Sequence, residues 1–476
     1  MLEYLEPRGV FGFFEELCAV PHGSGNTKAI SDYLVSFARA RGLEHYQDEL
    51  NNVIIIKEAS CGYEMSKPVI LQGHMDMVCE KAPDCAKDME KEGLDLAVEG
   101  DTVYAVGTTL GGDDGIAVAM MLAALDDEAL PHPRLECVFT VDEEVGMEGA
   151  AGLDVTPLHG RRLLNIDSED EGIFTVGCAG GNRTHCVVPV KREYFTGTVI
   201  TVTVSGLIGG HSGVEIHKGR ANASVVLGRA LYAVSKVLPM RIVSVDGGLK
   251  DNAIPVGARA VITVADAEAA RRALDRLGAA LRNEYAVTDP GICLASKEGG
   301  EGAPMDRDST DRVLCLLTNC PNGVQVMSAD MEGLVQTSLN LGVLTTADGA
   351  VEASFCVRSS VDSQKEMVTD RLRCLTQQLG GSIRVTGDYP GWQYRHDSPL
   401  RDLLTQVYME QYGKVPSVEA IHAGVECGLF CGKIPELDCV SIGPDLTDIH
   451  TCREKMHIAS VQRTWALLTE TLRRMA

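Results

Sequence analysis

The order of apolar segments along the chain is the feature that most constrains its fold. Up to about residue 190, short apolar stretches alternate with stretches of helical periodicity, which indicates an α/β sheet with helices on its faces. The strand candidates are residues 52–57, 68–72, 135–141 and 162–166, and the helix candidates are residues 10–20, 26–41 and 114–125. The first part of the chain therefore predicts an α/β domain.

The pattern changes near residue 190 and returns to α/β near Pro399. Residues 198–205 alternate cleanly, as expected of a strand with one solvated face, and Ala347-Asp348-Gly349 is a hairpin turn signal. Further strands are expected at 241–245, 258–264, 334–345, 351–358, 382–386 and 438–442, and helices at 219–237, 268–285, 363–379, 400–412 and 461–475. We therefore expect a discontinuous α/β domain (1–188 and 390–476) that carries an inserted α+β domain (189–389).

Charge and cysteine usage exclude several classes of partner. With 67 Asp and Glu against 43 Lys and Arg, the net charge of −24 disfavours nucleic acid and anionic membranes, which need a basic surface. The 16 cysteines are scattered without a Cys-x-x-Cys pair, as in a reduced cytosolic protein. The acidic N-terminus does not resemble a signal peptide, and no apolar run reaches the ~18 residues of a membrane span. We expect a soluble, cytoplasmic protein.

Polar side chains interrupt the chain where apolar strands end. The strand at 68–72 leads into Gly73-His74-Met75-Asp76, and the strand at 135–141 leads into Asp142-Glu143-Glu144. Asp167 follows the next strand, His450 follows a late one, and Asp113-Asp114 opens an apolar helix. Ligands of open α/β sheets lie outside the carboxyl ends of the strands. Five His, Asp or Glu groups at one edge therefore predict a pocket for divalent metal ions.

Each of these groups alone has an ordinary structural interpretation. A strand-end His is often a surface residue, and two acids at a helix start often complement the helix dipole. Their conjunction favours two divalent cations that share one bridging Asp, with a spare carboxylate to take a proton from an activated water. His and carboxylate ligands without Cys fit Zn, and they also fit Co or Mn. Spacing does not decide between Asp113 and Asp114, or between Glu143 and Glu144.

A set of motifs in order along nearly the whole chain, from Pro21-His22 to His457, is similar to one known family. They are GHMDMV, TTLGGDDGIAVA, FTVDEEVGMEGA, LLNIDSEDEG, GGHSGVEIHKGRANA, DNAIP, VRSSVDS, IHAGVECGLF and IGPDLTDIH. They resemble the aminoacyl-histidine dipeptidase (cytosolic non-specific dipeptidase) family, within a group of two-metal peptidases that includes aminoacylases and glutamate carboxypeptidases. The resemblance implies a mixed-sheet metallopeptidase catalytic domain with an inserted α+β lid domain, which also mediates homodimerisation.

The resemblance also implies roles for individual residues. Each metal would have three ligands and share one, the sets being His74, Asp113 and Asp167, and Asp113, Glu144 and His450. Glu143 would be the general base that activates the bridging water, and Asp76 would orient the His74 imidazole. A cis peptide bond between Asp113 and Asp114 is implied as well. Relatives carry Ser-Pro-Asp-Glu after the last metal His, whereas Thr-Cys-Arg-Glu follows His450 here, which leaves His457 as a rival ligand.

In the inserted domain the resemblance implies three substrate-binding residues. His211 would polarise the scissile carbonyl, in its own active site or across a dimer interface, and Asn252 and Arg358 would contact the substrate carboxylate. Surface or salt-bridge roles are the alternatives for His211 and Arg358. Glu426 would either accept the free amine of the substrate or serve a structural role.

The expected activity is metal-dependent hydrolysis of dipeptides with free termini, of Xaa-His type or of broad specificity. An aminoacylase or carboxypeptidase acting on N-acyl amino acids is the enzyme alternative. A non-catalytic metal-binding homologue is the alternative of another class, and the presence of Asp76, Glu143 and all the candidate ligands weighs against it.

Overall fold

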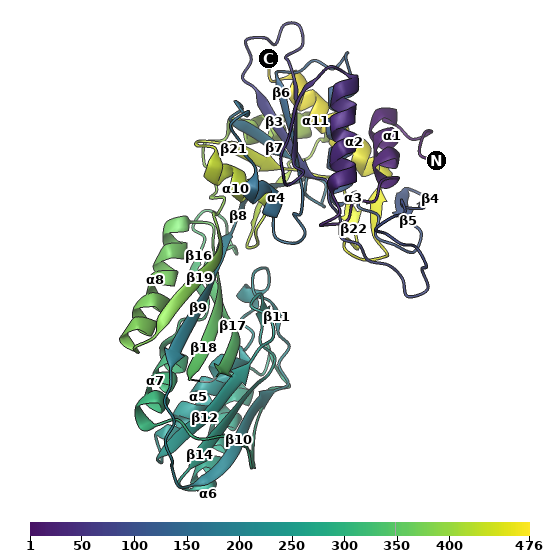
Figure 1. The fold of residues 1–476 in the computed structure, drawn as a ribbon. Helices are drawn as coiled ribbons and strands as arrows, with labels where there is room; N and C mark the ends of the chain where they lie inside the picture. The colour runs from purple at the N-terminus through teal and green to yellow at the C-terminus, as the bar shows by residue number, and fades with distance from the viewer. Residues whose placement is uncertain (348) are drawn as a thin grey trace. The chain divides into compact units, whose positions relative to one another are not determined.

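The computed structural model describes residues 1–347 and 349–476, and they form two compact units. Unit 1 comprises Met1–Gly177, Trp392–Ala420 and Val425–Ala476, and unit 2 comprises Cys178–Gly391 and Ile421–Gly424 (Figure 1). Within the described residues, no helix is both long enough and apolar enough to cross a membrane. The expected roles of the two parts, as catalytic domain and as lid and dimerisation domain, stay predictions.

Unit 1 is built on a mixed sheet. In the described chain its strands follow the order β1 (Glu44–Gln47), β2 (Val53–Lys57), β6 (Leu135–Thr140), β3 (Val69–His74), β7 (Arg162–Asn165), β21 (Asp438–Ser441), β8 (Ile173–Cys178) and β20 (Ser417–Ile421). The central strands β6, β3, β7 and β21 run parallel, whereas β1, β2 and β8 pair antiparallel with their neighbours. Every residue of β3 and β6 is buried, which is why these strands are continuous apolar runs rather than alternating ones.

Helices cover this sheet and each other. They are α1 (Arg8–Cys18), α2 (Lys28–Ala40), α3 (Gly112–Asp126), α4 (Glu148–Gly152), α9 (Pro399–Tyr412), α10 (Glu426–Lys433) and α11 (Ile458–Arg473). Helix α3 packs between α1 and strand β3 and is buried almost all round, as its sequence GIAVAMMLAAL requires. A small antiparallel sheet joins β4 (Leu96–Glu99), β5 (Thr102–Ala105), β23 (Lys455–His457) and β22 (Leu446–Thr447).

Unit 2 contains a large antiparallel sheet with helices packed against it. Its strands follow the order β15 (Cys293–Glu298), β10 (Thr198–Ser205), β14 (Ala258–Val264), β12 (Met240–Gly247), β17 (Val335–Ala347), β18 (Ala350–Ser359), β9 (Gly180–Pro189) and β19 (Ser382–Tyr389), with β16 (Gly323–Met327) on β17. The helices are α5 (Ala223–Ser235), α6 (Ala267–Glu284), α7 (Arg307–Asn319) and α8 (Asp362–Gln378), with a short η1 (Ile216–Lys218) and a small β11 (Gly210–His211) and β13 (Ala253–Ile254) pair. One apolar core joins these helices to the sheet.

The predicted fold class is confirmed, with an α/β mixed sheet in unit 1 and an α+β arrangement in unit 2. Strands β10 and β14 coincide with the predicted ranges. In the predicted hairpin, Asp348 lies outside the described residues, and the flanking strands pair antiparallel with Ala347 opposite Ala350. Strand β9 and helix α7 were not predicted.

Candidate metal centre

The carboxyl ends of three parallel strands bring the predicted side chains together in unit 1. His74 is the last residue of β3, Glu144 follows β6 and Asp167 follows β7. Asp113 lies in the first turn of α3, and His450 lies in the loop between β22 and β23. Parallel strands end at one edge of their sheet, so residues far apart in sequence reach the same place.

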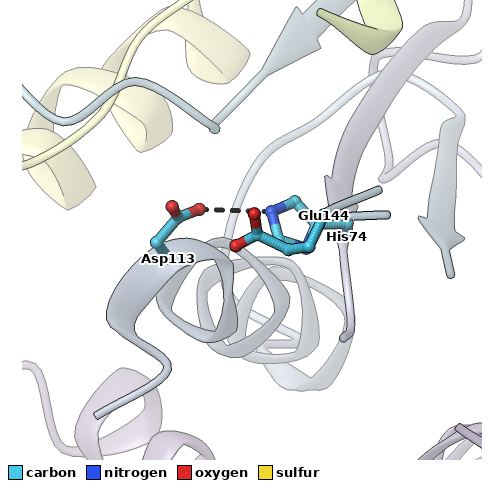
Figure 2. Close-up of side chains that lie close together, drawn as sticks. All are labelled: His74, Asp113 and Glu144. Carbon is cyan, nitrogen blue, oxygen red and sulfur yellow. Dashed lines mark hydrogen bonds and ion pairs between the residues drawn. The ribbon is translucent and has the colours of Figure 1, made fainter. Parts of the chain in front are cut away.

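Asp113 lies between two histidines. Its Oδ1 is 3.1 Å from His74 Nε2, and its Oδ2 is 3.1 Å from His450 Nε2. Each histidine has a second carboxylate beside it, because Asp167 Oδ1 is 3.6 Å from His74 Nε2 and Glu144 Oε1 is 2.9 Å from His450 Nε2. Figure 2 shows the side chains of His74, Asp113 and Glu144 converging from separate elements. Two groups of three donors therefore share Asp113.

Asp114, the next residue of the same turn, also reaches this cluster. Its Oδ2 accepts a hydrogen bond from the backbone N–H of His74 at 3.1 Å, and the peptide bond that joins it to Asp113 is cis, as the sequence comparison implied. Donor atoms of His74, Asp114 and Asp167 lie within 4.8 Å of one another, as do those of His74, Asp113 and Glu144. Geometry alone thus leaves Asp114 as a further possible ligand beside the predicted set.

Gly73 explains how α3 comes so close to the end of β3. A Cβ atom at this position would lie 2.5 Å from Asp114 Oδ2 and 2.8 Å from the Cβ of Ala117. Any larger residue would therefore push the first turn of α3 away from the strand. The glycine before His74 is a packing requirement of the site.

Asp76 connects the His74 end of the site to Glu143. The Nδ1–H of His74 donates to the backbone carbonyl of Asp76 at 2.9 Å, and the carboxylate Oδ1 of Asp76 is 3.4 Å from the same nitrogen. That carboxylate also accepts hydrogen bonds from the Ser24 hydroxyl at 2.8 Å and from the backbone N–H of Glu143 at 3.2 Å. The imidazole is thus oriented mainly by a carbonyl, and the Asp76 carboxylate fixes the backbone of Glu143.

The electrostatics of this cluster call for positive charge. Burial raises the pKa of Glu143 to about 9 and that of Asp167 to about 6, and neighbouring carboxylates contribute to both increases. Burial opposes protonation of His74, yet Asp167, Asp113 and Asp76 together raise its pKa well above the usual range. The carboxylates of Asp113 and Glu144 raise the pKa of His450 to about 10. These shifts indicate a cluster that favours bound positive charge.

The residues present fit divalent cations. Glu144 Oε1 is buried and accepts no hydrogen bond from the described residues, although His450 Nε2 lies only 2.9 Å away. Donor atoms of Glu144, His74 and Asp113 lie within 4.8 Å of one another, close enough to be ligands of one ion. Imidazole nitrogens and carboxylate oxygens are ligands typical of zinc, and also of cobalt and manganese. His457 does not join the cluster. It lies on β23, where it pairs with Thr102 of β5.

Unit 2 holds the predicted substrate-binding residues, of which His211 has a defined tautomer. Its Nδ1 accepts from the backbone N–H groups of Gly213 at 3.2 Å and Val214 at 3.3 Å. Burial, together with the charge of Arg358, lowers the pKa of His211. The neutral ring therefore carries its proton on Nε2 and can donate a hydrogen bond from that atom. Asn252 is exposed, next to β13, and its carbonyl accepts from the N–H of Ser212 at 2.9 Å.

Arg358 is a buried guanidinium without a carboxylate partner among the described residues. It is 8% exposed, its Nε donates to no described residue, and its Nη1 is 3.4 Å from the Tyr389 hydroxyl. On the paired strand, Ser338 lies opposite Arg358, and its hydroxyl is 2.7 Å from His422 Nε2. Burial, together with Arg358, lowers the pKa of His422 to about 3. Because a buried charge is costly without a partner, this site favours an anion.

Four residues in or beside these sites were not predicted: Ser338, Tyr389, His422 and Glu454, whose carboxylate accepts from the backbone N–H of Gly112 at 2.8 Å and of Asp113 at 3.4 Å. His422 and Glu454 lie in or beside segments that carried the family resemblance, whereas Ser338 and Tyr389 gave no sequence signal. Glu426, for which two roles were open, is fully buried, and its Oε2 accepts from Gln72 at 2.6 Å and Thr140 at 2.7 Å. Its Oε1 has no hydrogen-bond partner among the described residues, and burial raises its pKa to about 7.

Comparison with known proteins identifies close relatives. The sequence is 39% identical to the cytosol non-specific dipeptidase of Escherichia coli K12 over 477 residues, which is 99% of this chain and 98% of that protein. The structure matches that of aminoacylhistidine dipeptidase from Vibrio alginolyticus with a TM-score of 0.94 and 35% identity, over 99% of this chain and 97% of that one. Aminopeptidase PepT from Bacillus cereus shares the fold, with a TM-score of 0.58 and 15% identity over 99% of both chains.

The family model of peptidase family M20/M25/M40 matches residues 70–474, a range that includes every candidate ligand described above. With this match and an identity of 39% over nearly the full length, the chain belongs to peptidase family M20/M25/M40.

Proposed function

We propose that this peptidase hydrolyses dipeptides with free termini at a centre of two divalent cations. The observation that carries the proposal is the position of Asp113, each of whose oxygens faces a histidine with a further carboxylate beside it. One cation would be held by His74, Asp113 and Asp167, and the other by Asp113, Glu144 and His450. Zinc is the metal that we propose, with cobalt or manganese as substitutes.

The cations, when bound, supply Lewis acidity, which polarises the scissile carbonyl and lowers the pKa of a water. The positive charge of the bound cations would keep the Glu143 carboxylate ionised, although burial and the neighbouring carboxylates raise its pKa to about 9. Glu143 then accepts a proton from the water as the water oxygen attacks the carbonyl carbon, and it passes that proton to the leaving amine when the C–N bond breaks. The Asp76 carboxylate holds the Glu143 backbone N–H at 3.2 Å and so limits where the Glu143 carboxylate can reach. Hydrolysis thus leaves one free carboxylate and one free amine.

Unit 2 would recognise the substrate. His211 can donate from Nε2 to the carbonyl oxygen, because its Nδ1 is occupied by two backbone N–H groups. Arg358 would bind the terminal carboxylate as a bidentate pair, with Asn252 as a further contact. His211 would act in its own active site or in that of a partner subunit, and we propose a homodimer formed through this inserted part.

The named activities of the E. coli and Vibrio relatives support a dipeptidase. None of the sixteen cysteines, all of which lie within the described residues, forms a disulfide, which supports a reducing, cytoplasmic location. An aminoacylase or carboxypeptidase would accept an N-acetylated substrate. Comparing a free dipeptide with its N-acetyl form therefore separates these activities, and a preference for the acetylated form would refute the dipeptidase.

The proposed base is tested by Glu143→Ala, with turnover and bound metal measured on the same sample. We expect turnover to fall by roughly 10²–10⁴-fold while both cations remain bound. Near wild-type turnover would show that Glu143 is not the base. Loss of metal together with turnover would show that Glu143 is a ligand.

A further inference from the structure

A buried carboxylate outside the predicted ligand set holds the loop that leads into Asp113. Glu454 is 3% exposed, and its Oε2 accepts from the backbone N–H of Leu110 at 2.8 Å and of Gly111 at 3.1 Å. Its Oε1 accepts from the N–H of Gly112 at 2.8 Å and of Asp113 at 3.4 Å. One side chain thus binds four successive amides, the last of which belongs to the shared candidate ligand.

These amides need an external acceptor because of where they lie. They precede or begin helix α3, and the first N–H groups of a helix have no partner inside it. The residue at the N-cap is Gly111, at φ 67°, which has no side chain to accept them. A carboxylate at this end also complements the positive end of the helix dipole. Glu454 therefore fixes the backbone from which Asp113 projects.

Glu454 also ends the loop that carries His450. Strands β22 and β23 form a hairpin in which Leu446 pairs with Met456 and Thr447 with Lys455, so that His450 and Glu454 lie in the same connection. Inside this loop the N–H of Glu454 donates to the carbonyl of Thr451 at 3.1 Å. The same residue therefore joins the His450 loop to the Asp113 loop, and His450 Nε2 meets Asp113 Oδ2 at 3.1 Å.

We propose that Glu454 is a positioning residue that sets the separation of His450 and Asp113 and thereby the affinity for the second cation. The inference rests on the two-cation site proposed above. The first cation depends less on Glu454, because the main sheet places two of its three proposed ligands, His74 at the end of β3 and Asp167 just after β7, and Gly73 packs directly against α3. The second depends on His450, which only the hairpin loop supplies.

The test is Glu454→Gln, titrated with Zn²⁺ and with Co²⁺ after removal of metal from the purified full chain. The amide nitrogen that replaces one oxygen cannot accept, so two of the four N–H groups lose their partner. We expect two binding steps in the wild type and a second step weakened by roughly 10–100-fold in the variant, with the first step changed by less than about threefold. The visible spectrum of bound Co²⁺ reports the same change without any assay of activity.

Glu136→Gln is the matched control. Glu136 is also fully buried and also accepts backbone N–H groups, from His159 at 2.9 Å and Gly160 at 2.9 Å, but these belong to no candidate ligand. We expect this variant to lower the melting temperature and leave both binding steps unchanged. If Glu454→Gln does not fold, Glu454→Asp replaces it, since the shorter side chain keeps the charge but cannot reach all four amides.

The outcomes separate the inference from the proposed function. A second step within about threefold of wild type, or equal weakening of both steps, would overturn the role of Glu454. A wild-type chain that binds fewer than two cations would overturn the proposed site together with the inference.

Discussion

Replacing Arg358 by methionine removes a buried positive charge to which the described residues bring no carboxylate. In most buried ion pairs, loss of one partner leaves the other charge buried without a partner and destabilises the protein. Among the described residues, the substitution removes the 3.4 Å hydrogen bond from Arg358 Nη1 to the Tyr389 hydroxyl, and Arg358 Nε has no partner to lose. An apolar side chain of similar length should therefore leave the free energy of unfolding unchanged or raise it by at most about 4 kcal/mol.

The same substitution should strongly weaken catalysis on substrates with a free carboxylate. If Arg358 binds that carboxylate in its buried site, its loss costs about 2–5 kcal/mol, because the carboxylate would then be buried without a partner. This corresponds to a decrease of roughly 30- to 5,000-fold in kcat/KM. A dipeptide with a C-terminal amide brings no charge, so its kcat/KM should change far less.

The assay is a double-mutant cycle of wild type and Arg358→Met against a dipeptide and its C-terminal amide. Arg384→Met is the control, since Arg384 lies on β19 of the same unit with 63% of its side chain exposed and 3.9 Å from Glu352. We expect wild-type kinetics for the control on both substrates. The reasoning is refuted if Arg358→Met still prefers the free dipeptide by the wild-type factor, or if the variant is markedly less stable than the wild type.

Two further variants test the packing and the charge state described above. Gly73→Ala places a Cβ 2.5 Å from Asp114 Oδ2 and should weaken metal binding by more than about tenfold in a metal titration. Gly12→Ala, with open space around the new Cβ, is the control and should leave the metal affinity unchanged. Equal metal affinities of the two variants would contradict the packing role of Gly73. The pKa of His422 is lowered to about 3 in the folded protein, so its neutral form adds stability above the unfolded pKa of about 6.5 and loses it as the pH falls from there toward 3. Urea unfolding at several pH values should show a shallower loss of stability below pH 6.5 in His422→Gln, by up to about 1.4 kcal/mol per pH unit, and an unchanged slope would refute this charge state.

The residues of the candidate metal centre can be grouped from the sequence because they follow elements with strong patterns. Strands β3, β6 and β7 are buried apolar runs, and a parallel sheet brings their carboxyl ends to one edge whatever the intervening chain does. The positions of His74 at the end of β3, of Glu144 after β6 and of Asp167 after β7 are therefore enough to group them. Strand positions do not decide between Asp113 and Asp114, because both residues contact His74. Asp113 lies beside the side-chain Nε2 of His74, and Asp114 accepts from the backbone N–H of His74.

Elements without an apolar pattern were not predicted. Strand β9 begins with Gly-Gly-Asn-Arg-Thr-His and yet lies between β18 and β19, where pairing on both sides compensates for its weak propensity. Helix α7 begins with the polar run Arg-Asp-Ser-Thr-Asp, and most of the residues that it packs into the core come later. In both cases the tertiary contacts that decide the structure come from segments distant in sequence.

Glu454 shows why supporting residues are harder to predict than ligands. A ligand is recognised by its chemistry, since His and Asp at a strand end are few and their grouping is unusual. A supporting carboxylate is one of 67 acids, and its role is defined by backbone N–H groups more than 340 residues away, which leave no trace in the sequence. The groups that Glu454 binds are backbone N–H groups, which every residue except proline has and which no residue type therefore marks. The placement of Asp113 and His450 thus depends on contacts that only the folded chain reveals.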